Sequence, residues 1–301
     1  MRLAQIERHG ASMEELQRIV GAMRAIASMR VQEAVRALSS VRQYGNALAD
    51  AVRQALAIAA DELVGSSEPP RLGSRRAIVV FTSEHGFVGG FNERLLDAAA
   101  PRPGDTLIMV GSRGAALAVE RGLPVTSAHA MATRLASIPE TVRRVQESLY
   151  PAIAPGETAH AEVLFGRYQR SGAADIQRHR LFPLEIAPER ERPGPAPLHD
   201  LSAAELLERM TAEYILAQLT EAAVESLAAE NGARFAAMEA AHDNVGKRLQ
   251  ALRLDASRAR QEEVTTELLD LVTGGLAVTR DANPDPYLCG CGSATDELSI
   301  S

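Results

Sequence analysis

One stretch decides the fold of this chain: Met238-Glu-Ala-Ala-His-Asp-Asn-Val-Gly-Lys-Arg-Leu-Gln-Ala-Leu252. Its mostly apolar key positions recur at alternating spacings of three and four, which is the signature of a left-handed coiled coil. The series continues to residue 263 with two polar interruptions: Met238, His242, Val245, Leu249, Leu252, Ala256, Ala259 and Glu263. We therefore expect Val245, Leu249 and Leu252 to face a partner helix.

The partner is expected at the other end of the chain, where the same rhythm recurs. Its positions are Met13, Leu16, Val20, Met23, Ala27, Arg30, Ala34, Ala37, Val41, Tyr44, Leu48, Ala51 and Ala55. Only Arg30 breaks the apolar set, and we place Met13 and Val20 in the seam. Because alanine is abundant and leucine scarce, little area is buried per residue, so we expect length to hold the pair together.

The two helical arms are predicted over residues 3–63 and 201–280. Neither contains proline, which favours continuous helices. A helix of about 80 residues would be ~120 Å long, a length that suits a shaft or strut. The alternative is an ordinary helical bundle whose helices break at unmarked turns. Glycines at five positions favour local weak points: Gly10, Gly21, Gly45, Gly232 and Gly246.

Between the arms, short apolar strands alternate with helices, which predicts an α/β layer with mainly parallel pairing. Strands are expected at 77–82, 106–110, from 124, at 160–168 and at 181–186, and helices at 94–100, up to 121 and at 138–150. The predicted divisions are an N-terminal helix at 1–64, an α/β domain at 75–190, a C-terminal helix at 200–280 and an acidic tail at 281–301.

Composition limits the function classes. The 301 residues carry a net charge of −7, which argues against a broad nucleic-acid-binding surface. No apolar run approaches the ~20 residues of a membrane-spanning helix, and no secretory signal is recognisable. The two cysteines, Cys289 and Cys291, lie together in the tail and lack further metal ligands nearby, so free thiols are expected.

Two glycine-rich turns follow predicted strands, where phosphate-binding loops lie in nucleotide-binding proteins. The first runs Gly86-Phe-Val-Gly-Gly-Phe-Asn92 and the second Gly111-Ser-Arg-Gly114. Neither has the Lys of a P-loop nor the dinucleotide-binding glycine pattern. We interpret Gly86, Gly89, Gly90 and Asn92 as a structural turn and expect no cofactor, no metal and no catalytic residue.

Three stretches together resemble the γ, or central rotor shaft, subunit of F-type ATP synthases. They are the first-helix segment Gly21-Ala-Met-Arg-Ala-Ile-Ala-Ser-Met-Arg30, the turn Phe81-Thr-Ser-Glu-His-Gly-Phe-Val-Gly-Gly-Phe-Asn92, and a C-terminal region with Met238-Glu-Ala-Ala-His-Asp-Asn244, Ala259-Arg-Gln261 and Val272-Thr-Gly-Gly275. Their order and spacing match along about 280 residues. The chain departs from the family in having fewer basic residues in the first helix and in running on past Arg280.

The resemblance implies a fold and a function. The fold would be a long antiparallel coiled coil of the N- and C-terminal helices with an inserted Rossmann-like α/β domain. The function would be that of a non-catalytic rotor with three sets of partners: the α and β subunits of the hexamer, the ε subunit and the membrane ion-driven c-ring. It would lie on the cytoplasmic face of a bacterial inner membrane. Hexamer contacts are implied for Arg260, Gln261, Glu267 and Met23.

Two rival functions remain open from the sequence. The first is a Rossmann-like enzyme that binds a nucleotide at the Gly86–Asn92 turn, which tight binding of ATP, ADP or NAD would favour. The second is a coiled-coil adaptor with no rotary role, and isolation of the chain without ATP synthase subunits would favour it.

Overall fold

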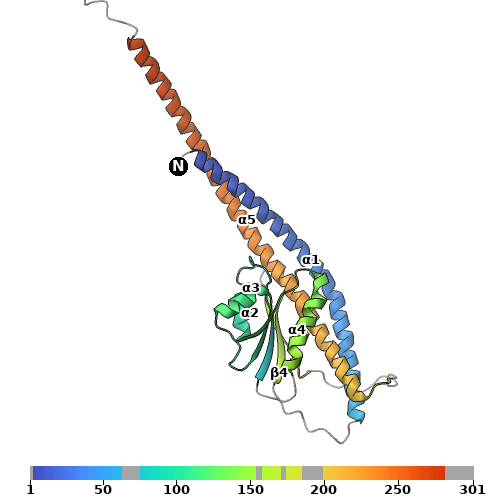
Figure 1. The fold of residues 1–301 in the computed structure, drawn as a ribbon. Helices are drawn as coiled ribbons and strands as arrows, with labels where there is room; N and C mark the ends of the chain where they lie inside the picture. The colour runs from blue at the N-terminus through green and yellow to red at the C-terminus, as the bar shows by residue number, and fades with distance from the viewer. Residues whose placement is uncertain (1–2, 63–74, 154–157, 171–173, 185–198, 282–301) are drawn as a thin grey trace, which may run out of the picture. The chain divides into compact units, whose positions relative to one another are not determined.

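The computed structural model describes residues 3–62, 75–153, 158–170, 174–184 and 199–281 (Figure 1). Apart from Asp281, the predicted acidic tail lies outside the described residues. The elements in chain order are α1 (Leu3–Glu62), β1 (Arg75–Phe81), α2 (Phe91–Ala99), β2 (Thr106–Val110), α3 (Ser112–Glu120), β3 (Val125–His129), the 3-10 turn η1 (Leu135–Ser137), α4 (Ile138–Ala152), β4 (Thr158–Arg167), β5 (Asp175–Phe182) and α5 (Ala203–Asp281).

The predicted fold class is confirmed: two long terminal helices contact each other, and a five-stranded α/β sheet is inserted between them in the chain. α1 has 60 residues and α5 has 79, without a break in either, so the alternative of a bundle with broken helices is wrong. The absence of proline inside both helices leaves every backbone N–H free to donate within the helix.

The chain divides into two compact units, and each contains part of both long helices. The first unit is Met1–Leu16 with Val245–Ser301 and the second is Gln17–Asn244, which includes the whole sheet. In the first unit Glu7 pairs with Arg260 and Glu14 with Arg253, so moving forward along α1 means moving backward along α5. In the second unit Arg42 of α1 pairs with Glu221 and Glu225 of α5.

The sheet has the strand order β3-β2-β1-β4-β5. β1 pairs in parallel with both β2 and β4, and β2 pairs in parallel with β3. β5 is antiparallel to β4 and forms the other edge. The expected extended piece at 181–186 therefore proves to be the end of a strand that begins at Asp175. Its first half carries polar residues, such as Gln177 and Arg178, so this part of the strand lacks the continuous apolar run by which the other strands were predicted.

Each face of the sheet has its own helical cover (Figure 1). α4 and α5 cover one face, where Val79, Ile108 and Val163 are fully buried. α2 and α3 cover the other, where Ile78, Met109 and Leu164 are fully buried. The central strands β1 and β2 are apolar on both faces for this reason.

α5 is enclosed on all sides where it crosses the sheet. Every residue of 222–234 is buried, although a surface helix normally shows one exposed side. The side chains there are mostly small, and a Cβ on Gly232 would lie 2.7 Å from the Tyr168 ring, so this position admits only glycine without rearrangement. The coil and the α/β layer of the second unit are therefore packed as one core.

The predicted seam positions of α1 form two alternating series, one that contains Val20 and Ala27 and one that contains Leu16 and Tyr44. The structure buries the first series but not the second. Val20, Ala27, Ala34 and Ala55 are 6%, 1%, 0% and 2% exposed. The intervening track lies one residue later than predicted, at Val31, Leu38 and Val52, which are all buried. Two residues predicted for the seam, Leu16 and Tyr44, are 41% and 49% exposed, so their placement was wrong.

Candidate functional site

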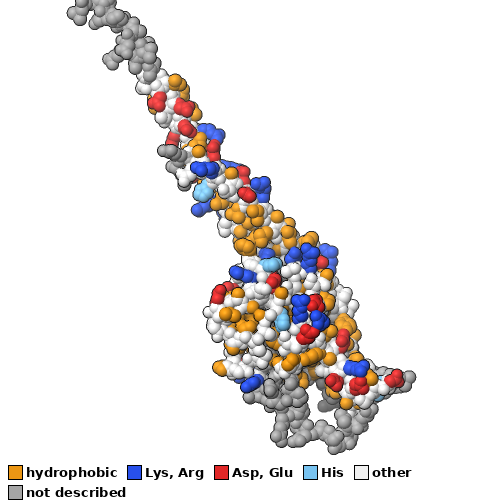
Figure 2. Space-filling model, viewed as in Figure 1, with side chains coloured by type: hydrophobic (Ala, Val, Ile, Leu, Met, Phe, Trp, Pro, Cys, Tyr) orange, Lys and Arg blue, Asp and Glu red, His pale blue; other side chains and the backbone are white. Residues whose placement is uncertain are grey.

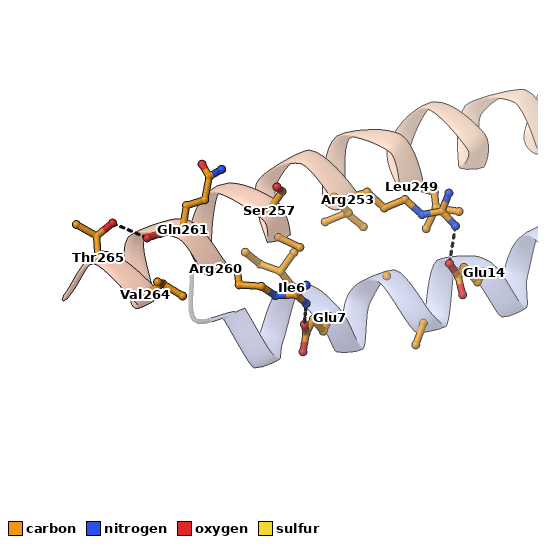
Figure 3. A pocket seen from close by; sticks show the side chains of 14 residues that line it. Ile6, Glu7, Glu14, Leu249, Arg253, Ser257, Arg260, Gln261, Val264 and Thr265 are labelled. Carbon is orange, nitrogen blue, oxygen red and sulfur yellow. Dashed lines mark hydrogen bonds and ion pairs between the residues drawn. The ribbon is translucent and has the colours of Figure 1, made fainter. Parts of the chain in front are cut away.

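In the first unit, the start of α1 and the distal part of α5 border an open groove of about 880 Å³ (Figure 3). Two ion pairs cross it, Arg260–Glu7 and Arg253–Glu14, each with a shortest N–O distance of 2.7 Å. Leu249 and Leu252 also line the groove, and Leu249 is only 5% exposed. A Cβ on Gly10 would meet no atom within 4 Å, so the groove is wide at this point.

The residues predicted for partner contact behave differently from one another. The Arg260 side chain is 65% exposed but already bonded to Glu7, so its guanidinium has donors left for another carboxylate. Gln261 is among the residues that line the groove, and its amide group points away from α1 (Figure 3). Glu267 is exposed farther along the helix, and Met23, half-buried, belongs to the second unit.

Beyond Ala259 the pattern of burial stops. Every residue of 260–273 is exposed, including apolar side chains that a helix pair would normally cover. Their exposed fractions are 50% for Val264, 57% for Leu268, 59% for Leu269, 72% for Leu271 and 60% for Val272. Such a run of exposed apolar residues is typical of a surface that docks against another protein.

The remaining residues predicted for the seam differ in how deeply they are buried. Val20 is 6% exposed, and Met13 and Leu252 border the same smaller hollow on another side of the first unit. Val245 is half-buried. Two of the contact residues, Arg260 and Gln261, thus share one groove with seam residues.

The glycine turn between β1 and α2 is held by its asparagine. Asn92 is 7% exposed, accepts the Ser83 N–H at 2.9 Å and donates to Ser83 Oγ at 2.8 Å. Gly89 adopts φ +55°, a conformation that glycine takes without strain, and Gly90 precedes the first residue of α2. The turn leaves Phe87 67% exposed.

The sheet edge where a nucleotide would bind is occupied by a side chain of the protein itself. In parallel sheets, ligands bind at the carboxyl ends of the strands. There Glu84, after β1, accepts the Ser112 N–H at 3.0 Å, the Ser112 hydroxyl at 2.6 Å and the Met131 N–H at 2.8 Å. Its carboxylate fills the N-terminus of α3, the place that a phosphate would take, and would repel one.

The electrostatics of Glu84 follow from these bonds. Burial by itself would raise the pKa of the carboxyl, but the hydrogen bonds from Ser112 and Met131 outweigh it and hold the pKa below its ordinary value. The second glycine turn is closed as tightly: a Cβ on Gly114 would lie 2.1 Å from Thr82 Oγ1. The geometry therefore does not favour the nucleotide-binding enzyme.

The turn is also fastened to the coil. Arg234 of α5 donates to the carbonyl oxygens of His85 and Gly86, both at 3.3 Å, and pairs with Glu230 at 2.6 Å. Burial raises the pKa of Glu230 although Arg234 opposes the shift. Sequence reasoning missed this network and the one around Glu225. Their signal was the presence of charged residues in the otherwise small and apolar run of 222–234.

The surface seen in Figure 2 has no large patch of a single charge. Basic and acidic side chains are intermingled on the face in Figure 2. Among the described residues, no group of three His, Cys, Asp or Glu side chains is placed to hold a metal ion. The groove, the exposed apolar run and the filled sheet edge together define a class: a coiled-coil subunit that works through contacts with other proteins.

Comparison with known proteins makes the class specific. The family model described as ATP synthase matches residues 2–278. The ATP synthase gamma chain of Geobacter metallireducens is 28% identical over 290 residues, which cover 92% of this chain and 98% of that protein. The gamma chain of Geotalea uraniireducens is 25% identical over 291 residues, with the same coverage. The chain belongs to the ATP synthase gamma-chain family and is a central-stalk rotor subunit, not itself an enzyme.

Solved structures agree on the fold. A chain in the mitochondrial ATP synthase of Euglena gracilis (OSCP/F1/c-ring, rotational state 3) has a TM-score of 0.67 at 15% identity, covering 96% of this chain and 99% of that one. A chain in the central stalk/c-ring of the Tetrahymena thermophila mitochondrial enzyme has a TM-score of 0.54, also at 15% identity, covering 74% and 99%.

Proposed function

We propose that this chain couples rotation of a membrane ion-driven c-ring to ATP synthesis or hydrolysis in a hexamer of α and β subunits, with the ε subunit as a further partner. We place it on the cytoplasmic face of a bacterial inner membrane. Membership of the gamma family supports the proposal. So do the similar folds found in complexes that contain F1 and the c-ring.

The proposed hexamer contact rests on one observation: the exposed apolar side chains within residues 260–273. Burial of Leu268, Leu271 and Val272 in a partner would release about 25 cal/mol per Å² of apolar surface. We infer that Arg260, Gln261 and Glu267, which belong to the same exposed stretch, also contact the hexamer. Arg260 can add a charge-assisted bond to an acidic loop because Glu7 occupies only part of its donor set.

A second contact belongs to α1. Met23 lies beside outward-facing apolar residues, since Ile19, Ile26 and Met29 are 52%, 50% and 59% exposed. These residues turn away from the buried track of Val20 and Ala27. We infer that Met23 and this outer face meet the hexamer as well.

In this proposal, rotation is coupled to ATP chemistry because different sides of the rotor make different contacts with the catalytic subunits. A shaft whose sides differ presents a different surface to each catalytic subunit, and rotation changes which subunit meets which side. A rotor shifts a subunit's conformational equilibrium only by as much as its contacts favour one state over another. The exposed apolar run and the outer face of α1 are the surfaces that would supply such differences.

The proposed association with the membrane depends on partner subunits. The described residues include no helix with both the length and the apolar character needed to cross a bilayer. We propose that the c-ring attaches this chain to the membrane. Purification of the tagged chain from its native membrane tests the assembly: co-isolation of α, β, ε and ring subunits is expected. Isolation of the chain without them would favour a coiled-coil adaptor.

The proposed contact of Arg260 is tested by comparing three variants of the assembled complex. Arg260→Ala should lower ATP hydrolysis, by roughly tenfold if one charge-assisted contact of ~1.4 kcal/mol is lost. Glu7→Gln removes the same intramolecular ion pair but keeps the arginine, so it should retain near wild-type turnover. Arg253→Ala removes the matching pair with Glu14 and is the second control. Equal losses in all three variants would mean that Arg260 acts only within the coil.

A further inference from the structure

An ionic junction in the second unit joins three elements at one carboxylate. Glu225 of α5 accepts a hydrogen bond from Arg42 of α1, and Arg167 at the end of β4 lies 3.7 Å from the same oxygen. Arg42 also binds Glu221, one turn earlier on α5, at 3.2 Å. Side chains of α1, α5 and β4 thus meet at this point.

The junction is not an ordinary surface pair. The Glu225 side chain is 2% exposed, whereas those of Arg42 and Arg167 are 47% and 37% exposed. A buried carboxylate is costly unless it is paired, so Glu225 holds its two arginines in place. The arginines come from elements that are distant in sequence. Arg42 donates the hydrogen bond to Glu225, whereas Arg167 Nε makes no hydrogen bond and attracts the carboxylate by charge from 3.7 Å.

The surroundings explain why such a junction is needed. Ala222, Ala223, Ala228 and Ala229 form much of the buried surface of α5 against the sheet. Interlocking of packed helices depends on side-chain ridges that enter grooves, and alanine ridges are low. A helix packed through alanine resists separation better than it resists rotation about its own axis. Hydrogen bonds and ion pairs placed away from the axis of α5 would resist this rotation.

We propose that Glu225 is a positioning residue for coupling: through Arg42 and Arg167 it locks both coil helices to the sheet, so that torque passes between the α/β domain and the coil. This inference rests on the proposed rotor function, in which ring and hexamer act on different parts of the chain. Neighbouring bonds support the same joint, since Ser226 Oγ donates to the Phe81 carbonyl at 3.2 Å.

The test compares variants in complexes reconstituted into membrane vesicles. The readout is ATP-driven ion transport divided by ATP hydrolysis, measured per assembled complex. Glu225→Gln keeps the side-chain shape and leaves both arginines partly exposed to water, so the chain should fold. We expect the ratio to fall by about fivefold, the lower end for a coupling interaction, while hydrolysis continues. A role in stability alone would change the amount of complex and leave this ratio unaltered.

A second variant and a matched control complete the design. Arg42→Gln acts on the half-exposed partner and should lower the ratio in the same direction. The loss in the double variant should be smaller than the sum of the two single losses, because both changes remove the Arg42–Glu225 pair. Glu205→Gln breaks the exposed pair with Arg209 within α5 and should leave the ratio at the wild-type value.

The outcomes separate the two proposals. If wild-type complexes do not transport ions on ATP hydrolysis, the proposed function fails and the junction has no torque to carry. If wild-type complexes are coupled and both Glu225→Gln and Arg42→Gln retain the wild-type ratio, the inference about the junction is wrong and the rotor function stands.

Discussion

At the scale of single residues, Glu84 shows how a ligand-binding edge becomes structural. Its carboxylate follows β1 and bonds to Ser112 after β2 and to Met131 after β3, so it ties three parallel strands together at their carboxyl ends. The same edge in a nucleotide-binding protein is left open for a ligand. Thr82, packed against Gly111 and Gly114, closes the neighbouring space.

This role makes the stability of the chain depend on pH in a defined direction. Because hydrogen bonds hold the pKa of Glu84 below its ordinary value, its contribution is present above the unfolded-state pKa and is lost as pH falls through the folded-state pKa. Glu84→Gln should lower the free energy of unfolding by about 1–2 kcal/mol at pH 7. The difference from wild type should shrink as the pH is lowered below about 4.

The measurement is urea unfolding of the full chain at a series of pH values. Glu120→Gln, at an exposed position in α3, is the control and should follow the wild-type curve. A difference between Glu84→Gln and wild type that stays constant from neutral to acidic pH would show that the carboxylate form is not what the fold requires.

At the scale of elements, the heptad rhythm predicted which helices pair but only half of how they pair. In one predicted series of α1, residues at every seventh position, such as Val20, Ala27 and Ala34, are apolar and buried. The other track was displaced by one residue. Alanine and other apolar side chains occupy both candidate tracks, while the true one includes Gln17, Arg24 and Gly45, which periodicity discards.

The sheet shows the same limit. Strands buried on both faces were predicted from continuous apolar runs, whereas β5 was mostly missed because Arg178 and Arg180 interrupt its apolar residues. The ionic junction and the Glu84 bonds join residues far apart in the chain, and no local pattern reports such pairs. The turn at 86–92 was visible in the sequence because glycine marks it directly.

On α5, the pattern of burial gives a direct test of the seam. Leu249 is 5% exposed and Leu254, on the same helix, is 58% exposed. Leu249→Asp would bury a charge and should lower the free energy of unfolding by several kcal/mol, at least ~2. Leu254→Asp should change it by no more than about 0.5 kcal/mol. The check is thermal or urea unfolding of the full chain, and equal losses in the two variants would contradict the seam.

At the scale of the whole molecule, the residues that hold this protein together differ from the exposed residues that we propose act on partners. The core of the second unit encloses residues 222–234 completely, and charged groups there point to other parts of the same chain. Residues 260–273 of the first unit are exposed throughout. A rotor subunit needs both properties, because a shaft must not deform where torque enters and must offer side chains where torque is delivered.

The last prediction follows from that separation. The triple variant Leu268→Gln, Leu271→Gln, Val272→Gln changes only exposed side chains, so the full chain should unfold at the wild-type temperature within error. Its assembly with α and β subunits should weaken by more than about tenfold, because each lost apolar contact is worth ~1 kcal/mol. Val119→Gln in α3, where the valine is 66% exposed, is the matched control and should assemble normally. Normal assembly and turnover of the triple variant would show that the exposed apolar run is not a docking surface, whereas a lowered unfolding temperature would show that the run belongs to the chain's own core.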